Sequence, residues 1–142
     1  MSIGIPDLWP EAVQLTDVVS PLVILRHQAG LLRGRTNNIL DAEVKSHSDS
    51  EGIVHAFQFV VPALGRKTYT LFEVRHAADL VYPVTVMFEP IKIFDFNGYS
   101  WPSANDQTEF TQLLARVFGH PKTVGVIHSL LAQANEQAAT ND

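Results

Sequence analysis

Residues 67–90 read KTYTLFEVRHAADLVYPVTVMFEP, and this stretch decides the fold of the chain. β-branched and aromatic residues alternate with polar ones both in residues 67–76 and in residues 82–89. An alternation with a period of two is typical of strands that bury one face. Because only the short polar break around residues 77–80 separates the two halves, we predict two neighbouring antiparallel strands.

The same alternation continues on both sides of this stretch. Upstream it predicts two further strands, residues 39–47 and residues 53–61. Downstream it predicts a short fifth strand, residues 91–96, which Pro90 sets apart from the others. Asn97, Gly98 and the Ser-Trp-Pro-Ser segment that follows are predicted as loop.

Four helices are predicted around the strands. Ser20 followed by Pro21 is a capping residue followed by proline at the first helical position, and Gly34 is a natural stop. Asp106 and Glu109 resemble a capping box in front of an apolar stripe with helical spacing. The predicted helices cover residues 10–17, 21–32, 106–118 and 121–134.

Together these elements predict one α+β domain over residues 1–142. We expect a four- to five-stranded antiparallel meander with an N-terminal helix and two C-terminal helices packed on one face. A chain of 142 residues is long enough to bury one substantial core. The tail, residues 137–142, is expected to fray.

The strand register follows from the need to keep apolar residues on one face. A slip of one residue would turn every side chain of a strand to the other face. The predicted cross-strand pairs are Val44 with Phe57, Ala42 with Phe59, Phe57 with Phe72, Phe59 with Thr70, Val74 with Val84 and Phe72 with Val86. The predicted core face carries Leu40, Ala42, Val44, Phe57, Phe59, Val61, Phe72, Val74, Val84, Val86 and Phe88.

The opposite face combines charged residues with four apolar ones. In the predicted register it presents Val60, Tyr69, Leu71 and Met87 beside acidic and basic neighbours. A half-apolar sheet face is typical of a surface that another part of the chain or a second molecule covers. We therefore predict a homodimer or a complex with another protein through these four residues, with the competing possibility that the N-terminal segment around Leu8 folds across them.

A polar group is predicted at one end of the core face. The register brings His55 and His76 together there, with Ser46 and Tyr82 at the same end. Two imidazoles with a hydroxyl and a phenol are a candidate ligand site, metal site or acid–base site, because imidazole titrates near neutrality. The competing interpretation is that the two histidines cap an edge of the core and bind loops.

Three further features have ordinary structural interpretations. Arg26, Arg33 and Arg35 form the only basic cluster and are predicted to be a solvated helix face or to pair with carboxylates such as Asp41. His128, on the inward stripe of the last helix, is predicted as a core or edge residue. Tyr99 and Trp101 are predicted to fold back over the core, with the competing possibility that they are exposed binding anchors on a loop.

Composition narrows the function classes. The formal net charge is −5, which argues against binding a nucleic-acid backbone. The chain has no cysteine, no signal-peptide pattern and no apolar run long enough for a membrane span, so we expect a cytoplasmic protein. No catalytic, cofactor-binding or metal-binding motif is present, and no cofactor is predicted.

Two functions remain open on these grounds. The first is a small non-enzymatic interaction protein of the adaptor, chaperone-like or inhibitor type. The alternative is a small enzyme or a ligand- or metal-binding protein that uses a pocket near His55 and His76.

Overall fold

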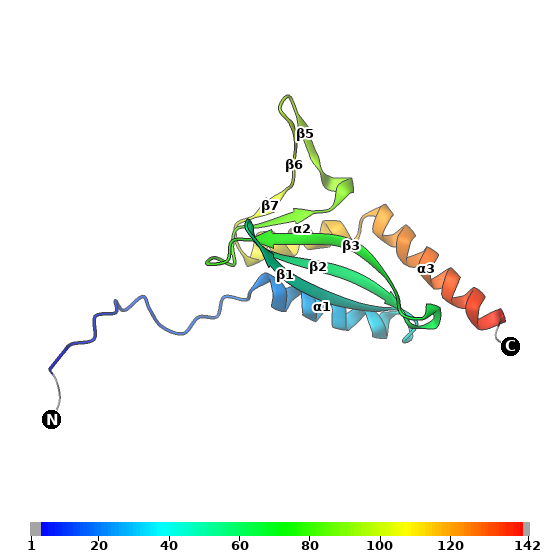
Figure 1. The fold of residues 1–142 in the computed structure, drawn as a ribbon, viewed down its shortest axis with the longest axis horizontal. Helices are drawn as coiled ribbons and strands as arrows, with labels where there is room; N and C mark the ends of the chain where they lie inside the picture. Colours follow the sequence, from blue (N-terminus) through cyan, green and yellow to red (C-terminus); the bar gives the residue numbers. More distant parts are fainter. Residues whose placement is uncertain (1–3, 141–142) are drawn as a thin grey trace.

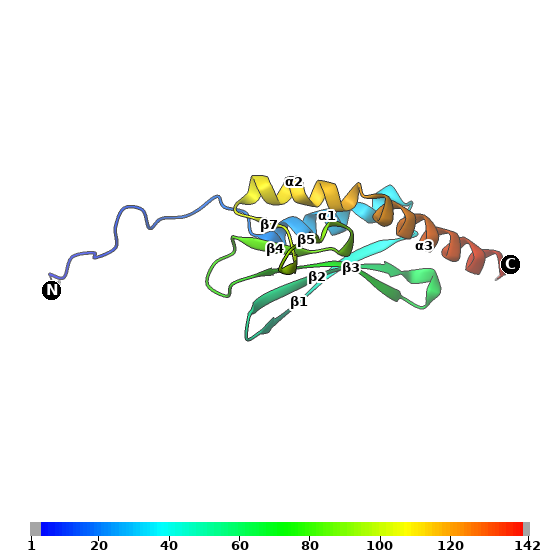
Figure 2. The same cartoon turned by 90° about the horizontal axis from the view of Figure 1, so that it is seen from above.

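The structure, a computed structural model, has an antiparallel sheet with the three helices of the described residues on one face (Figures 1 and 2). It describes residues 4–140. The five-stranded sheet has the order β1-β2-β3-β4-β7, and β5 and β6 form a separate two-stranded sheet. Figure 2 shows the helices along one side of the main sheet and the other side uncovered. This arrangement confirms the predicted α+β fold class.

The chain passes through the elements in the predicted order of helix, strands and two helices. Two short 3-10 turns, η1 (Pro62–Leu64) and η2 (Glu89–Ile91), follow β2 and β4. The helices and strands are α1 (Pro21–Arg35), β1 (Asp41–Asp49), β2 (Gly52–Val61), β3 (Lys67–His76), β4 (Val84–Met87), β5 (Ile93–Asp95), β6 (Gly98–Ser100), β7 (Ser103–Ala104), α2 (Gln107–Phe118) and α3 (Pro121–Thr140).

Helix α1 begins as predicted and ends later than predicted. The Ser20 hydroxyl accepts a hydrogen bond from the Val23 amide, and Pro21 is the first helical residue. The predicted stop at Gly34 is wrong, because a glycine costs a helix only about 1 kcal/mol and does not end it. The helix stops at Thr36, after which Asn37 and Asn38 adopt left-handed backbone angles that turn the chain into β1.

The two C-terminal helices also begin at their predicted signals. The Asp106 carboxylate accepts a hydrogen bond from the Glu109 amide at 2.9 Å, and the Glu109 carboxylate accepts one from the Asn105 amide at 2.8 Å. Helix α3 starts at Pro121 and continues to Thr140, past the predicted end at residue 134. Residues 137–140 of the tail that was predicted to fray are helical in the structure, and residues 141 and 142 lie outside the described part of the chain.

The predicted helix at residues 10–17 is wrong. This region forms only a turn, in which the Val13 amide donates to the Pro10 carbonyl at 3.0 Å. A helix this short needs a surface to pack against. Residues 4–18, which we call the N-terminal arm, instead extend away from the sheet (Figure 1). The arm does not fold across the open face of the sheet, as the competing possibility required.

The first hairpin has the predicted register, whereas β2 and β3 pair through a β-bulge. Phe57 pairs with Phe72 as predicted, but Gln58 pairs with Thr70 and Phe59 with Tyr69, so the predicted pair of Phe59 with Thr70 is wrong. Leu71 is the extra residue. A bulge lets two consecutive side chains of the longer strand face the same side, and here Leu71 joins Phe72 in the core.

Strand β4 is displaced by two residues from its predicted position. Val74 pairs with Val86, where Val84 was predicted, and Val84 pairs with His76. The connector after β3 runs to residue 83 and is longer than predicted, which moves β4 along its neighbour. Because the displacement is an even number, every side chain keeps its predicted face.

The predicted fifth strand at residues 91–96 does not join the main sheet. Its residues Ile93–Asp95 form β5, which pairs with β6 in a hairpin that projects from the domain (Figure 1). At its turn Asp95 pairs with Gly98, and the Asp95 carboxylate accepts a hydrogen bond from the Asn97 amide at 2.9 Å. The fifth place in the sheet belongs to β7, in a segment predicted as loop.

The core lies between the sheet and the helices. All residues of the predicted core face belong to this cluster or pack against it. Phe57 is at its centre, with the rings of Phe72 at 5.2 Å, Phe118 at 5.3 Å and Phe59 at 6.2 Å. Helix α1 contributes Ile24 and Leu25, and the C-terminal helices contribute Phe110, Leu113, Leu114, Val117, Leu130 and Ala134.

Candidate functional site

Ser46, His55 and His76 form one hydrogen-bonded chain across three strands. Ser46 on β1 lies opposite His55 on β2, and Ser46 Oγ is 2.6 Å from His55 Nδ1. His55 Nε2 is 2.9 Å from His76 Nε2 on β3. His76 Nδ1 lies 2.7 Å from the Ala77 carbonyl oxygen and 3.2 Å from that of Leu80. The structure therefore brings together three of the four residues predicted for this site.

The carbonyl groups at the end of the chain determine the direction of its hydrogen bonds. A carbonyl oxygen only accepts, so His76 Nδ1 carries the proton, and in the neutral ring His76 Nε2 is an acceptor. His55 Nε2 must then donate to it, which leaves His55 Nδ1 to accept from the Ser46 hydroxyl. Each polar atom of both rings is satisfied in this arrangement, as buried polar groups require.

Burial keeps His55 uncharged near neutral pH. His55 is 3% exposed and His76 is 7% exposed. Burial is the main cause that lowers the pKa of His55 to about 4, and electrostatic interactions with His76 and Arg26 contribute less. A base with such a pKa accepts a proton poorly at pH 7, so His55 is weakly suited to activating the Ser46 hydroxyl.

Tyr82, the fourth predicted residue, is not part of this chain. Its hydroxyl donates to the Val19 carbonyl at 2.9 Å, and its ring contacts the edge of Phe110 at 6.4 Å. Burial is the main cause that raises the pKa of Tyr82, and the negative charge of Asp106 contributes less. Tyr82 therefore attaches the segment just before α1 to the connector between β3 and β4.

We predict that stability falls in mild acid because of His55. As the pH falls below about 6.5, the unfolded chain protonates His55 while the folded chain does not until about pH 4. The free energy of unfolding is therefore expected to be about 2 kcal/mol lower at pH 5 than at pH 7. Urea unfolding at the two pH values measures this difference, and it should shrink in His55→Asn. An equal pH dependence in both proteins would contradict the assignment.

The carboxylate of Asp49 is not expected to obscure this measurement. The hydrogen bond from Arg75 lowers the pKa of Asp49 below its usual value, so Asp49 titrates at a more acidic pH than the window used. The Arg75 Nη1 atom is 2.8 Å from Asp49 Oδ1, at the tip of the β1–β2 hairpin.

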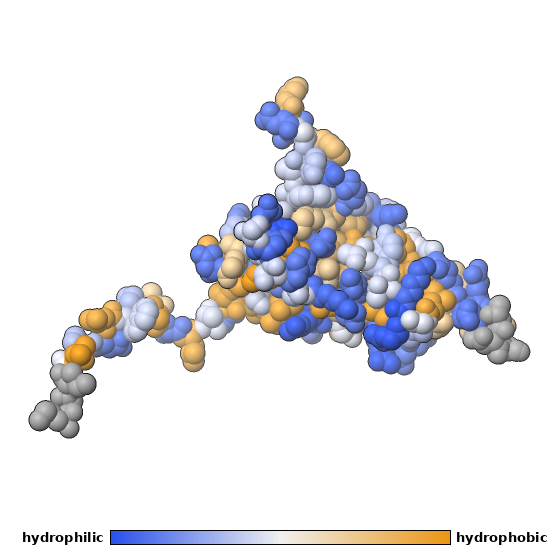
Figure 3. Space-filling view, viewed as in Figure 1, coloured by the Kyte–Doolittle hydropathy of each residue, from blue (hydrophilic) through white to orange (hydrophobic). Residues whose placement is uncertain are grey.

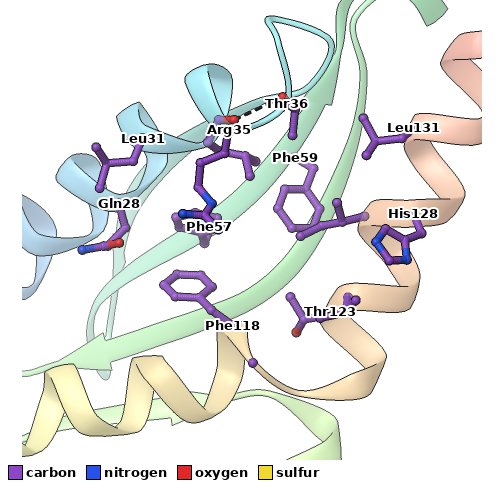
Figure 4. Close-up of a pocket in the computed structure, with 14 residues that line it drawn as sticks. Gln28, Leu31, Arg35, Thr36, Phe57, Phe59, Phe118, Thr123, His128 and Leu131 are labelled. Carbon is purple, nitrogen blue, oxygen red and sulfur yellow. Dashed lines mark hydrogen bonds between the residues drawn. The ribbon is translucent and has the colours of Figure 1, made fainter.

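A groove opens between α1 and α3, in a place that the sequence did not indicate. Its volume is about 590 Å³, which is within the range of ligand-binding pockets. Its floor is made of Phe57, Phe59 and Phe118 (Figure 4). Its walls come from the C-terminal half of α1 and the first half of α3, and they carry Leu31, Leu32, Val124, Ile127 and Leu131.

The groove is apolar with a basic rim. Within residues 4–140, its ionisable lining residues are Arg35 from α1 and His128 from α3, and no carboxylate lines it. Figure 4 shows both side chains at the groove, with Arg35 reaching toward the phenylalanine floor. Among the described residues Arg35 forms no ion pair, whereas Arg33 pairs with Asp41 at 3.5 Å as predicted. An anionic group at the rim would therefore be favoured.

His128 was predicted as a core or edge residue, and the structure places its side chain exposed at the groove. The groove joins segments about ninety residues apart, whose packing no local pattern specifies. The one feature of the sequence that could have indicated the groove was a histidine on an otherwise apolar stripe of the last helix. Its position is typical of a polar group at the margin of an apolar surface.

The four residues of the predicted interface do not share one face. Leu71, at 8% exposure, belongs to the main core, and the bulge turns Tyr69 to the helix side of the sheet with its partner Phe59. Val60 is buried and Met87 is half-buried on the uncovered face. The predicted grouping of Tyr69 and Leu71 with Val60 and Met87 is therefore wrong, because it assumed a β3 without a bulge.

Large apolar side chains are instead exposed in two projecting segments. Leu8 and Trp9 of the N-terminal arm are 82% and 74% exposed, and Phe94 and Phe96 of the β5–β6 hairpin are also exposed. Figure 3 shows hydrophobic residues along the arm and at the outer end of the hairpin. The prediction that Tyr99 covers the core is wrong: it is exposed on the hairpin.

Lys92 organises the base of this hairpin. Its ammonium group lies 4.0 Å from the centre of the Tyr99 ring and 4.8 Å from that of Trp101, and it pairs with Glu89 at 2.9 Å. These contacts gather the exposed ring of Tyr99 and the half-buried ring of Trp101 around one ammonium group.

Comparison with known proteins gives no family: no family model, curated protein or solved structure matches this chain. Within residues 4–140, no helix is long and apolar enough to cross a membrane. The same part of the chain contains no group of three or more histidine or carboxylate side chains that could hold a metal ion.

Proposed function

We propose that this chain is a non-enzymatic interaction protein that binds an apolar polypeptide segment in the groove between α1 and α3. Acidic residues of that segment pair with Arg35 and His128 at the rim. The observation that carries the proposal is the groove itself, an apolar cavity of about 590 Å³ whose ionisable lining residues, among those that the structure describes, are Arg35 and His128.

The electrostatics of the groove support a bound carboxylate. An exposed arginine with no ion pair among the described residues is available to a partner, and its planar guanidinium binds a carboxylate through two hydrogen bonds. Leu31 and Val124 expose apolar area beside it, and such area is available to be buried on binding.

The projecting hairpin supports an interaction role independently. Phe94, Phe96 and Tyr99 are exposed on a two-stranded element that adds little to the core. Aromatic side chains presented in this way are typical anchors at protein interfaces. The Ser46–His55–His76 chain, by contrast, is better explained as a satisfied polar network at the sheet edge than as catalytic machinery, because burial lowers the pKa of its central His55.

We expect the groove to bind 8-anilinonaphthalene-1-sulfonate, an aromatic dye with one anionic group. Binding should increase the dye's fluorescence, and Leu31→Asp should weaken it by at least about tenfold, because the new carboxylate repels the sulfonate and disrupts the apolar wall. Arg35→Gln should weaken it less, since only the charge at the rim is removed. Fluorescence titration of the dilute protein measures all three affinities.

Leu80→Asp is the matched control, because Leu80 is an exposed leucine outside the groove. Its affinity for the dye should equal that of the unmodified protein. Dye binding that Leu31→Asp and Arg35→Gln leave unchanged would show that the groove does not accept an apolar anion, and the proposal would fail.

A further inference from the structure

We infer that the groove of one copy is filled by the N-terminal arm of a second copy of this chain. This inference rests on the proposed function, since it names the polypeptide segment that the groove binds. Two copies exchange their arms, and each groove receives the apolar residues around Leu8 and Trp9.

The arm has the composition of a segment that binds elsewhere. Leu8 and Trp9 are 82% and 74% exposed, and Leu15 is fully exposed. In soluble proteins, apolar side chains concentrated in one exposed segment mark an interaction site. Tryptophan is also among the residues that contribute most to binding at protein interfaces.

The charges of the arm and the groove are complementary. The arm contains Asp7, Glu11 and Asp17 and no lysine or arginine. The groove presents Arg35 and His128, and no carboxylate among the described residues lines it. An acidic residue next to Leu8 and Trp9 would meet the basic rim when these two side chains enter the apolar floor.

The connection of the arm to α1 favours a second copy over the same copy. The arm joins α1 at its N-terminal end, whereas the groove lies beside the C-terminal half of α1. The hydrogen bond from Tyr82 to the Val19 carbonyl holds the last residues before α1. Figure 1 shows the arm leaving the domain on the side opposite to α3. To enter its own groove, the arm would have to reverse direction at that point.

The length of the arm is sufficient for exchange between two copies. The eleven residues from Leu8 to the end of the arm span up to about 36 Å when extended, more than the length of the 15-residue α1 at about 22 Å. With one arm and one groove on each copy, two reciprocal contacts close a two-fold symmetric dimer and leave no groove unfilled.

Light scattering combined with size-exclusion chromatography tests the exchange. The unmodified chain should form a dimer at high concentration and dissociate on dilution. The double variant Leu8→Asp and Trp9→Asp should be a folded monomer, because its arm no longer enters an apolar groove. Leu31→Asp should also be a monomer, because its groove no longer receives an arm. Leu80→Asp, the matched control, should remain a dimer.

Mixing the two monomeric variants is the decisive step. The arm variant retains an intact groove, and the groove variant retains an intact arm, so the mixture should form a heterodimer through one arm and one groove. A mixture that stays monomeric would overturn the inference. A dimer that the arm substitutions leave intact would also overturn it, and would indicate another surface, such as the open sheet face or the hairpin.

Monomeric behaviour of the unmodified chain at high concentration would overturn the inference as well. In that case iodide quenching of Trp9 fluorescence, measured in Trp101→Phe so that Trp9 is the single tryptophan, shows whether the arm lies in its own groove or in solvent. Neither outcome is arm exchange. The dye titration on the arm variant separates this failure from failure of the proposed function, because a groove that still binds the dye supports the function without exchange.

Discussion

Replacing Phe72 by alanine is expected to lower the free energy of unfolding by about 3–5 kcal/mol. Phe72 is 2% exposed, its ring stacks on Phe57 at 5.2 Å, and it meets the edge of Phe118 at 5.8 Å. Truncation removes buried apolar area and leaves a cavity between the sheet and α2, which the rigid β2–β3 pair closes only in part. Urea unfolding followed by circular dichroism gives the difference.

Phe94→Ala is the control for this prediction. Phe94 is an exposed phenylalanine on the β5–β6 hairpin, so its truncation should change the unfolding free energy by no more than about 0.5 kcal/mol. A loss of less than about 1 kcal/mol for Phe72→Ala would contradict the position of Phe72 in the core.

Leu71→Asp is expected to lower the free energy of unfolding by a similar amount, about 3–5 kcal/mol, or to prevent folding altogether. The bulge between Phe57 and Gln58 places Leu71 in the main core, so an aspartate there would be a buried carboxylate without a cation. Unfolding in urea at neutral pH measures the effect.

Met87→Asp is the matched comparison, because Met87 is half-buried on the uncovered face of the same sheet. A carboxylate at this position remains in contact with water, so the substitution should lower the free energy of unfolding much less than Leu71→Asp does. If both residues lay on the uncovered face, as a continuous β3 would place them, the two substitutions would have similar effects. Similar effects would therefore contradict the bulge.

The polar network is the part of the candidate site that the sequence predicted. His55, His76 and Ser46 occupy strand positions that the alternation of side chains assigns to one face and one end of the sheet. The two-residue displacement of β4 did not affect this assignment, because an even shift preserves faces. Whether the group is functional depends on its hydrogen bonds and burial, which alternation does not specify.

The sequence by itself determined the α+β class, the core face and the first hairpin, because strand alternation and helix caps are local patterns that act within a few residues. Ser20, Asp106 and Pro121 began their helices as predicted for this reason. The tertiary structure alone decided the bulge at Leu71, the separate β5–β6 hairpin, the free arm and the groove of Arg35 and His128. Each of these features depends on how segments that are distant in the sequence pack against one another. A local sequence pattern does not specify which of the possible contacts between such segments forms.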